Sequence, residues 1–190
     1  MKKFTLYFLF IISNSNYFYA QPSIQWQKPF GGSSDDGAYS IQQTTDGGYI
    51  VAGFSNSTDG DVTGNNGFYD YWIVKLNSSS TIQWQKSLGG TNDDEAFSIQ
   101  QTSDGGYIVA GYSYSIDGDV TGHHDSTGSH NDYWIVKLDS LGAIQWQKSL
   151  GGTSYDRSTS IRQTTDGGYI VAGYSESNDG DVTGNHDSIG

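Results

Sequence analysis

The 190-residue chain has no cysteine, and its basic residues are few: 9 lysines and arginines stand against 21 aspartates and glutamates. The missing cysteine excludes a disulfide framework, a thiolate metal site and a lipid-anchoring thiol. The net charge of −12 gives a surface that repels nucleic acid and anionic lipid. We therefore exclude both as partners, and we expect the fold to be held by its core or by bound divalent cations.

Long apolar runs are also missing. The longest apolar stretch, from Phe4 to Ile12, is too short to span a bilayer, which takes about 20 residues. It follows Lys2 and Lys3 and precedes Ala20, which is the pattern of a secretory signal peptide. We predict a signal at 1–20, export to the cell surface or the medium, a mature chain at 21–190, and no membrane insertion after cleavage. A buried N-terminal strand is the alternative, but it would leave the two lysines unexplained.

Outside that segment no stretch has a helical apolar period. Instead, 26 glycines and 5 tryptophans recur in a repeated pattern. The copies cover 24–81, 82–143 and an incomplete 144–190, or about 2.8 units of about 60 residues. A repeat of this length is a supersecondary unit that must stack on its neighbours to bury its apolar faces.

The second copy predicts four strands. Residues 96–102 and 144–150 alternate apolar and polar side chains, as half-buried strands do, whereas 107–113 and 133–138 are apolar on both faces apart from Lys137. An Asp-Gly pair after 96–102 predicts a hairpin. We predict an all-β fold of four-stranded antiparallel sheets, stacked as the blades of an incomplete, open β-propeller. A β-helix is the rival, although its coils repeat at shorter periods.

The pattern GG…DD.A.SIQQT.DGGYIVAGYS…DGDVTG…DYWIVKL…IQWQKSLGG covers 24–190. It resembles the propeller-type repeats of large secreted and cell-surface proteins of bacteria, many of which are similar to type IX secretion cargo with a separate sorting domain. The third copy departs from the pattern, since it stops after its DGDVTG loop. We therefore expect a fragment of a longer protein. The alternative is a short chain that completes its ring as a homo-oligomer.

The DGDVTG loops are the candidate metal site. Two copies fit D-x-D-x-T-G-x-x-D, which resembles calcium loops of some propellers and the start of an EF-hand loop; alternate oxygen side chains can converge on one ion while glycine permits the turn. The alternative is a polar loop of Asx turns. The predicted Ca²⁺ ligands are Asp117, Asp119, Thr121 and Asp125, then Asp179, Asp181, Thr183 and Asp187, and, with Gly67 in place of the last acid, Asp59, Asp61, Thr63 and Asn65.

Other motifs admit a structural and a functional interpretation. The Thr-x-Asp-Gly-Gly turns partly resemble the Asp-box of sialidase propellers, which is a structural turn. Asp36, Asp94 and Asp156 recur once per unit, which favours turn capping over acid–base catalysis. A histidine-rich insertion in the second copy could hold zinc but is more typical of a solvated loop. The five tryptophans are expected to pack between sheets, with Trp26, Trp84 and Trp146 the more plausible sugar contacts.

Every conspicuous polar residue is copied between units, whereas an active site normally breaks such symmetry. We therefore expect a non-enzymatic structural or binding module that presents loops to a protein or glycan ligand. The alternative is a fragment of a secreted propeller enzyme, glycan-active or quinoprotein-like, whose catalytic residues lie outside this chain.

Overall fold

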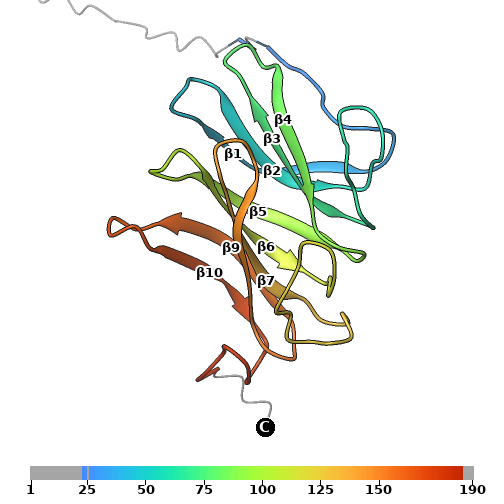
Figure 1. Ribbon diagram of the computed structural model, residues 1–190, viewed down its shortest axis with the longest axis vertical. Helices are drawn as coiled ribbons and strands as arrows, with labels where there is room; N and C mark the ends of the chain where they lie inside the picture. Colours follow the sequence, from blue (N-terminus) through green and yellow to red (C-terminus); the bar gives the residue numbers. More distant parts are fainter. Residues whose placement is uncertain (1–22, 25, 186–190) are drawn as a thin grey trace, which may run out of the picture.

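The computed structural model describes residues 23–24 and 26–185, so the predicted signal peptide and the predicted ligand Asp187 lie outside the described residues. The described chain is all-β (Figure 1). Its strands are β1 (Asp36–Gln43), β2 (Tyr49–Ser55), β3 (Asp70–Leu76), β4 (Ile82–Leu88), β5 (Asp94–Gln101), β6 (Tyr107–Ser113), β7 (Asp132–Leu138), β8 (Ile144–Leu150), β9 (Asp156–Gln163) and β10 (Tyr169–Ser175). Within this part of the chain no helix is long and apolar enough to cross a membrane.

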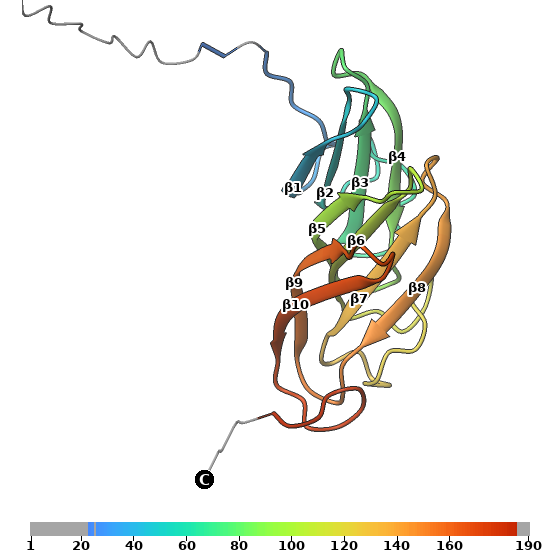
Figure 2. The same cartoon turned by 90° about the vertical axis from the view of Figure 1, so that its left-hand side faces the viewer.

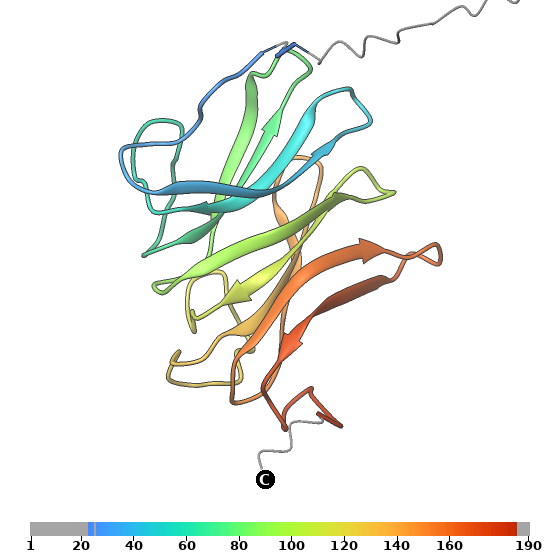
Figure 3. The same ribbon diagram turned by 180° about the vertical axis from the view of Figure 1, so that it is seen from behind.

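The strands form three antiparallel sheets, one for each repeat. Two are four-stranded, with the orders β1-β2-β3-β4 and β5-β6-β7-β8, and the third is the hairpin β9-β10. The sheets are stacked one after another along the molecule (Figure 2), and no sheet closes on itself. Seen from behind, the hairpins β1-β2, β5-β6 and β9-β10 follow each other in the same orientation (Figure 3).

The burial of each strand follows its sequence pattern. β3 and β6 are buried at every position, and β7 at all but one, as expected for strands that are apolar on both faces. β8 is largely exposed, as its alternation predicts. β5 begins at Asp94, two residues before the predicted start, because Asp94 and Glu95 pair with the end of β6.

Lys75 and Lys137 interrupt apolar strands yet are 4% and 2% exposed. Each ammonium group reaches a hairpin turn, where it lies 2.8 Å from Asp46 or 2.9 Å from Asp104. Lys75 also donates hydrogen bonds to Gln83 and to its neighbouring carbonyl. A buried lysine is tolerated here because its stem packs among apolar groups while its charge is paired.

A bulge recurs in the first hairpin of each unit, at Ala38/Ser40, at Ala96/Ser98 and opposite Ala172/Gly173. A glycine of the second strand lies across from it. A side chain at Gly111 would collide with the Glu95 carbonyl and would lie 2.7 Å from the Tyr71 hydroxyl. The glycine of YIVAGYS therefore permits two close approaches, one within its sheet and one from the preceding sheet.

The main core lies between the first two sheets. Tyr71 and Trp134 are fully buried there, with ring centroids 4.7 Å apart, and the Tyr71 hydroxyl donates a 2.9 Å hydrogen bond to the Trp134 carbonyl. The hydrophobic cluster around them includes side chains of both sheets, among them Ile50, Ile73 and Val136. Stacking of consecutive sheets thus hides the middle strands from water, as the repeat length requires.

Candidate functional site

The acidic DGDVTG loops bind the chain's own backbone. Asp59, Asp117 and Asp179 accept hydrogen bonds from the amides of Ser33, Thr91 and Thr153 at 2.7–2.8 Å. Asp61 and Asp119 accept longer ones from Gly31 and Gly89 at 3.2 and 3.3 Å. Each loop therefore clasps the Gly-Gly turn that begins its own unit, and the bond from Thr153 lowers the pKa of Asp179.

The remaining predicted calcium ligands face other partners. Thr63 and Thr121 accept hydrogen bonds from Gln85 and Gln147. Asn65 donates to the Ser55 carbonyl at 2.9 Å. Thr183 is exposed within the third loop.

Asp125 turns into the insertion, where it accepts hydrogen bonds from the amides of Thr127, Ser129 and His130. The bonds from Thr127 are the main reason that its pKa is lowered. In the residues that the structure describes, no group of three or more histidine, aspartate or glutamate side chains is placed to hold a metal ion. The predicted set is thus not brought together as an EF-hand-like cage, and calcium binding stays a prediction.

The histidines of the insertion are also separated. His123 contacts the carbonyls of Ser113 and Asp125. His124 lies between Asp132, at 2.7 Å, and Asp181, at 3.5 Å. His123 and His124 thus tie the insertion to the ends of β6 and β7, while Ser126, Thr127 and Ser129 are exposed, as expected of a solvated loop.

The aspartates that begin β1, β5 and β9 cap the Gly-Gly turns, as expected. Asp94 Oδ2 accepts hydrogen bonds of 2.8 Å from the Gly90 amide and the Ser115 hydroxyl, and Asp36 and Asp156 accept the equivalent bonds. The role is structural and repeats in all three units.

Sequence reasoning missed that Asp94 has an acidic neighbour in the preceding sheet. A side chain at Gly89 would collide with both Asp94 Oδ2 and Asp70 Oδ1, so the two carboxylates face each other across this glycine. Both residues are fully buried, and each leaves Oδ1 without a hydrogen bond. Burial raises the pKa of Asp94 to about 7 and that of Asp70 to about 6. In the sequence, this pair of carboxylates was indicated only by the aspartate that precedes each YWIVKL segment.

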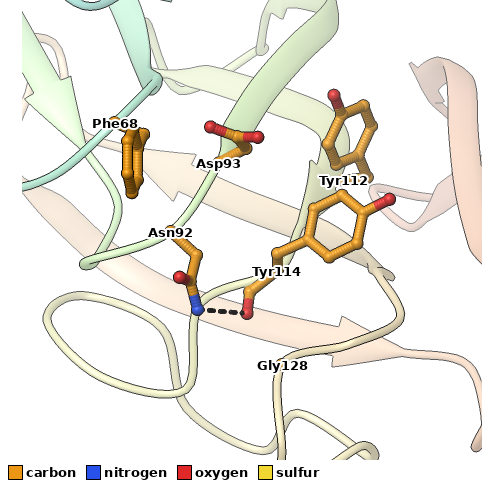
Figure 4. A pocket seen from close by; sticks show the side chains of 6 residues that line it. All are labelled: Phe68, Asn92, Asp93, Tyr112, Tyr114 and Gly128. Atoms are coloured by element: carbon orange, nitrogen blue, oxygen red, sulfur yellow. Dashed lines mark hydrogen bonds between the residues drawn. The ribbon is translucent and has the colours of Figure 1, made fainter.

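A hollow of about 380 Å³ lies between the first two units and the insertion (Figure 4). Aromatic rings, an amide and a carboxylate gather around it, and Asn92 Nδ2 donates a 3.1 Å hydrogen bond to the Tyr114 carbonyl. The rings of Tyr112 and Tyr114 stand edge to face at 5.6 Å. The lining residues are Phe68, Asn92, Asp93, Tyr112, Tyr114 and Gly128.

An aromatic strip extends from this hollow across the sheets. Phe97 stacks on Tyr39 at 4.5 Å and on Tyr112 at 5.8 Å. The guanidinium of Arg157 lies 4.0 Å from the Phe97 ring centre. Tyr39 is 51% exposed and Phe68, at the hollow, 63%. The strip and the hollow together present aromatic surface to solvent beside acidic groups.

The sequence carries a signal for this hollow that reasoning from repeated residues overlooked. The position of Tyr114 is Asn56 in the first unit and Glu176 in the third, and the position of Asn92 is serine in both. Tyr114 and Asn92 thus break the repeat, whereas Tyr112 and Asp93 recur as Tyr174 and Asp35, and the insertion completes the hollow.

Trp84, Trp134 and Trp146 pack between sheets, as expected, whereas Trp72 lies in a cluster of first-unit side chains. Trp84 meets the ring of Tyr107 at 5.7 Å, and Trp146 meets Tyr169 in the same way. Trp26 lies 6.1 Å from Tyr49, the equivalent tyrosine of the first unit. Trp26 and Trp146 keep 48% and 40% of their surface exposed.

No family model matches the chain. The regulatory protein FlaEY of Caulobacter vibrioides is 30% identical over 136 residues, a match that takes 68% of this chain and 14% of FlaEY. This chain therefore spans only a small part of the length of the curated relative that it matches.

Proposed function

We propose that this chain is an exported, non-enzymatic binding module that works at the cell surface or outside the cell. Its sheets act as blades of an open propeller, and the hollow beside Tyr114 takes a protein or glycan ligand. The observation that carries the proposal is that Tyr114 and Asn92, which line the hollow, break the repeat, while the aspartates that cap and clasp the Gly-Gly turns in every unit are engaged in structural hydrogen bonds.

The chemistry of the hollow favours a glycan. Sugar rings stack their apolar faces on aromatic side chains, and their hydroxyl groups need both donors and acceptors. Tyr112, Tyr114 and Phe68 supply rings, and Asp93 and Asn92 supply polar atoms beside them. The Tyr112 phenol is protonated at neutral pH, as an ordinary tyrosine is, and burial raises its pKa further.

A glycan array followed by calorimetry tests this proposal. We expect Tyr114→Asn, which installs the residue of the first unit, to weaken binding by about tenfold or more, as loss of an aromatic anchor does. Glu176→Ala, at the exposed equivalent position of the third unit, is the matched control and should leave affinity unchanged. A ligand that binds both variants as tightly as the parent chain would exclude the hollow as its site.

We also propose that calcium stiffens the DGDVTG loops. What supports it is the recurrence of acidic oxygens in all three loops and the surplus of negative charge. If each loop binds with a dissociation constant of about 0.1 mM, about 2 mM calcium would stabilise the fold by about 1.8 kcal/mol per site. Equal melting temperatures in calcium and in chelator would show that calcium does not stabilise the loops.

Export is tested by mass spectrometry of the protein recovered outside the producing cells. The proposal expects the recovered chain to begin at Gln21. A chain that stays in the cytoplasm with Met1 to Ala20 intact would contradict it.

A further inference from the structure

Gly89 leaves a space between two carboxylates that come from different sheets. The position that a Cβ would occupy at Gly89 lies 2.3 Å from Asp94 Oδ2 and 2.5 Å from Asp70 Oδ1. Calcium holds its oxygen ligands at about 2.3–2.6 Å, so two oxygens this close together can be bridged by a single ion. Any residue with a side chain in place of Gly89 would fill the space between them.

Asp70 Oδ1 is an unpartnered oxygen in the interior of the protein. Asp70 is fully buried, and its Oδ2 accepts a 2.7 Å hydrogen bond from the Asn66 amide, but no donor to its Oδ1 is found among the described residues. Asp94, which is also fully buried, faces it with an oxygen that already accepts two hydrogen bonds. Buried polar atoms are nearly always paired, so an oxygen aimed at a second carboxylate indicates a positively charged ligand.

No basic side chain of the described residues neutralises this pair. Ion pairs are found for Asp46 and Asp104 with buried lysines, but none is found for Asp70 or Asp94 in the same part of the chain. Burial raises the pKa of Asp94 to about 7, and burial together with the charge of Asp119 raises that of Asp70 to about 6. Both carboxylates are therefore ionised at pH 8, and buried charges without a partner are strongly unfavourable.

The second junction between units repeats the pair but adds a histidine. Asp132 Oδ1 and Asp156 Oδ2 lie 2.8 and 2.4 Å from the Cβ position of Gly151, and Asp132 Oδ1 is again buried without a hydrogen bond. Here His124 Nδ1 lies 2.7 Å from Asp132 Oδ2, so a protonated imidazole can balance part of the charge. Asn66 occupies the position of His124 in the first unit, and its amide cannot carry a charge. The first junction is therefore the one that needs an ion.

We propose that Asp70 and Asp94 form a binding site for a divalent cation of the calcium class. Asp70 begins β3 and Asp94 begins β5, so the ion joins the first sheet to the second. The site is separate from the DGDVTG loops, whose first aspartates are occupied by backbone amides. Two carboxylates, with main-chain carbonyls and water as further ligands, should bind calcium in the range of about 0.1–1 mM that is typical of extracellular modules.

Calorimetric titration of the 190-residue chain with calcium at pH 8, after treatment with chelator, tests this site. We expect Asp70→Asn to lose one of the calcium sites of the parent chain, with affinity at that site lowered about tenfold or more, because one of two charged ligands is gone. Asparagine keeps an acceptor for the Asn66 amide. Asp36→Asn is the matched control and should bind calcium as the parent does, because no carboxylate of a preceding sheet faces Asp36 across Gly31.

Thermal melts of the same proteins at pH 8 distinguish an ion from a shared proton. In chelator Asp70→Asn should melt at a higher temperature than the parent chain, because the repulsion between the two carboxylates is removed. Calcium should reduce this advantage, since only the parent gains the bridging ion. If the pair is neutralised by a proton alone, the difference between variant and parent will be the same in calcium and in chelator, and the proposal is overturned.

The loops and the pair are separated by a third variant. Loss of the calcium response in Asp117→Ala, with an unchanged response in Asp70→Asn, would assign the ion to a DGDVTG loop and overturn the site at Asp70 and Asp94 while leaving calcium at the loops in place. Loss of one site in Asp70→Asn, with the response of Asp117→Ala unchanged, is the result expected if the ion lies between the sheets. A parent chain that binds no calcium would overturn both.

Discussion

The facing carboxylates of Asp70 and Asp94 predict that this protein becomes more stable as the pH falls from 8 to 5. Asp94 releases its proton near pH 4 in the unfolded chain but at about 7 in the folded protein, because burial disfavours its charge. Between these values the folded state holds the extra proton, so stability is gained as the pH falls through 7 and is complete near 4. The interval of about three pH units corresponds to about 4 kcal/mol.

The substitution Asp94→Asn isolates this effect. Asparagine keeps an acceptor for Gly90 and Ser115 but carries no charge, so the variant should gain about 2.6 kcal/mol relative to the parent chain between pH 5 and pH 8, the part of the full effect that falls in this interval. Asp36→Asn is the matched control for loss of the turn cap, because Asp36 caps the equivalent turn of the first unit and no carboxylate of a preceding sheet faces it across Gly31.

Urea unfolding followed by tryptophan fluorescence measures the free energy at each pH, with a chelator present so that no divalent cation neutralises the pair. The expected result is a stability difference between Asp94→Asn and the parent that increases as the pH rises from 5 to 8. A difference for Asp94→Asn that is the same at pH 5 and pH 8 would refute the reasoning.

Three further predictions follow from particular contacts. Tyr71→Phe should lower the free energy of unfolding in urea by about 1 kcal/mol, because the hydrogen bond to the Trp134 carbonyl is lost. Tyr133→Phe should lower it by less, since no hydrogen bond from the Tyr133 hydroxyl is found among the described residues; equal losses for the two variants would contradict this difference. Asp117→Ala should cost about 1–2 kcal/mol and speed hydrogen exchange of the Thr91 amide, because the loop then loses its clasp on that turn; unchanged exchange there would count against the clasp. The hydrogen bonds from Lys75 hold the pKa of Asp46 well below its usual range, so the stability that this pair gives above pH 4 should be lost as the pH falls below 4. In Asp46→Asn this loss of stability in acid should be smaller, by less than about 1 kcal/mol because the carboxylate is half exposed. An equal loss in the variant and the parent would show that the pair does not contribute.

The strands could be predicted from the sequence because their signals are local. Alternation in 144–150 and apolar faces in 107–113 indicate which strand is outer and which is buried, and Asp-Gly after 96–102 fixes the turn. The repeat also required that one sheet stack on the next, since no unit of about 60 residues with this pattern buries its own faces.

The partners of the acidic residues could not be predicted in this way. The spacing of Asp117, Asp119 and Asp125 is compatible with one shared ion, but in the fold they are directed to the Gly-Gly turn and to the insertion. Which backbone amide a carboxylate meets depends on a turn about 26 residues away in the chain, a distance that local patterns do not encode.

The sequence alone therefore determined the strands, their faces and the need to stack. Only the tertiary structure decided that Asp70 meets Asp94, that Tyr114 lines a hollow, and that two identical segments have different surroundings. β6 and β10 share every residue, yet β6 is buried throughout and β10 is not. Whether a strand is buried depends on the elements that pack beside it, whereas the strand's own residues determine only which neighbours can pack there.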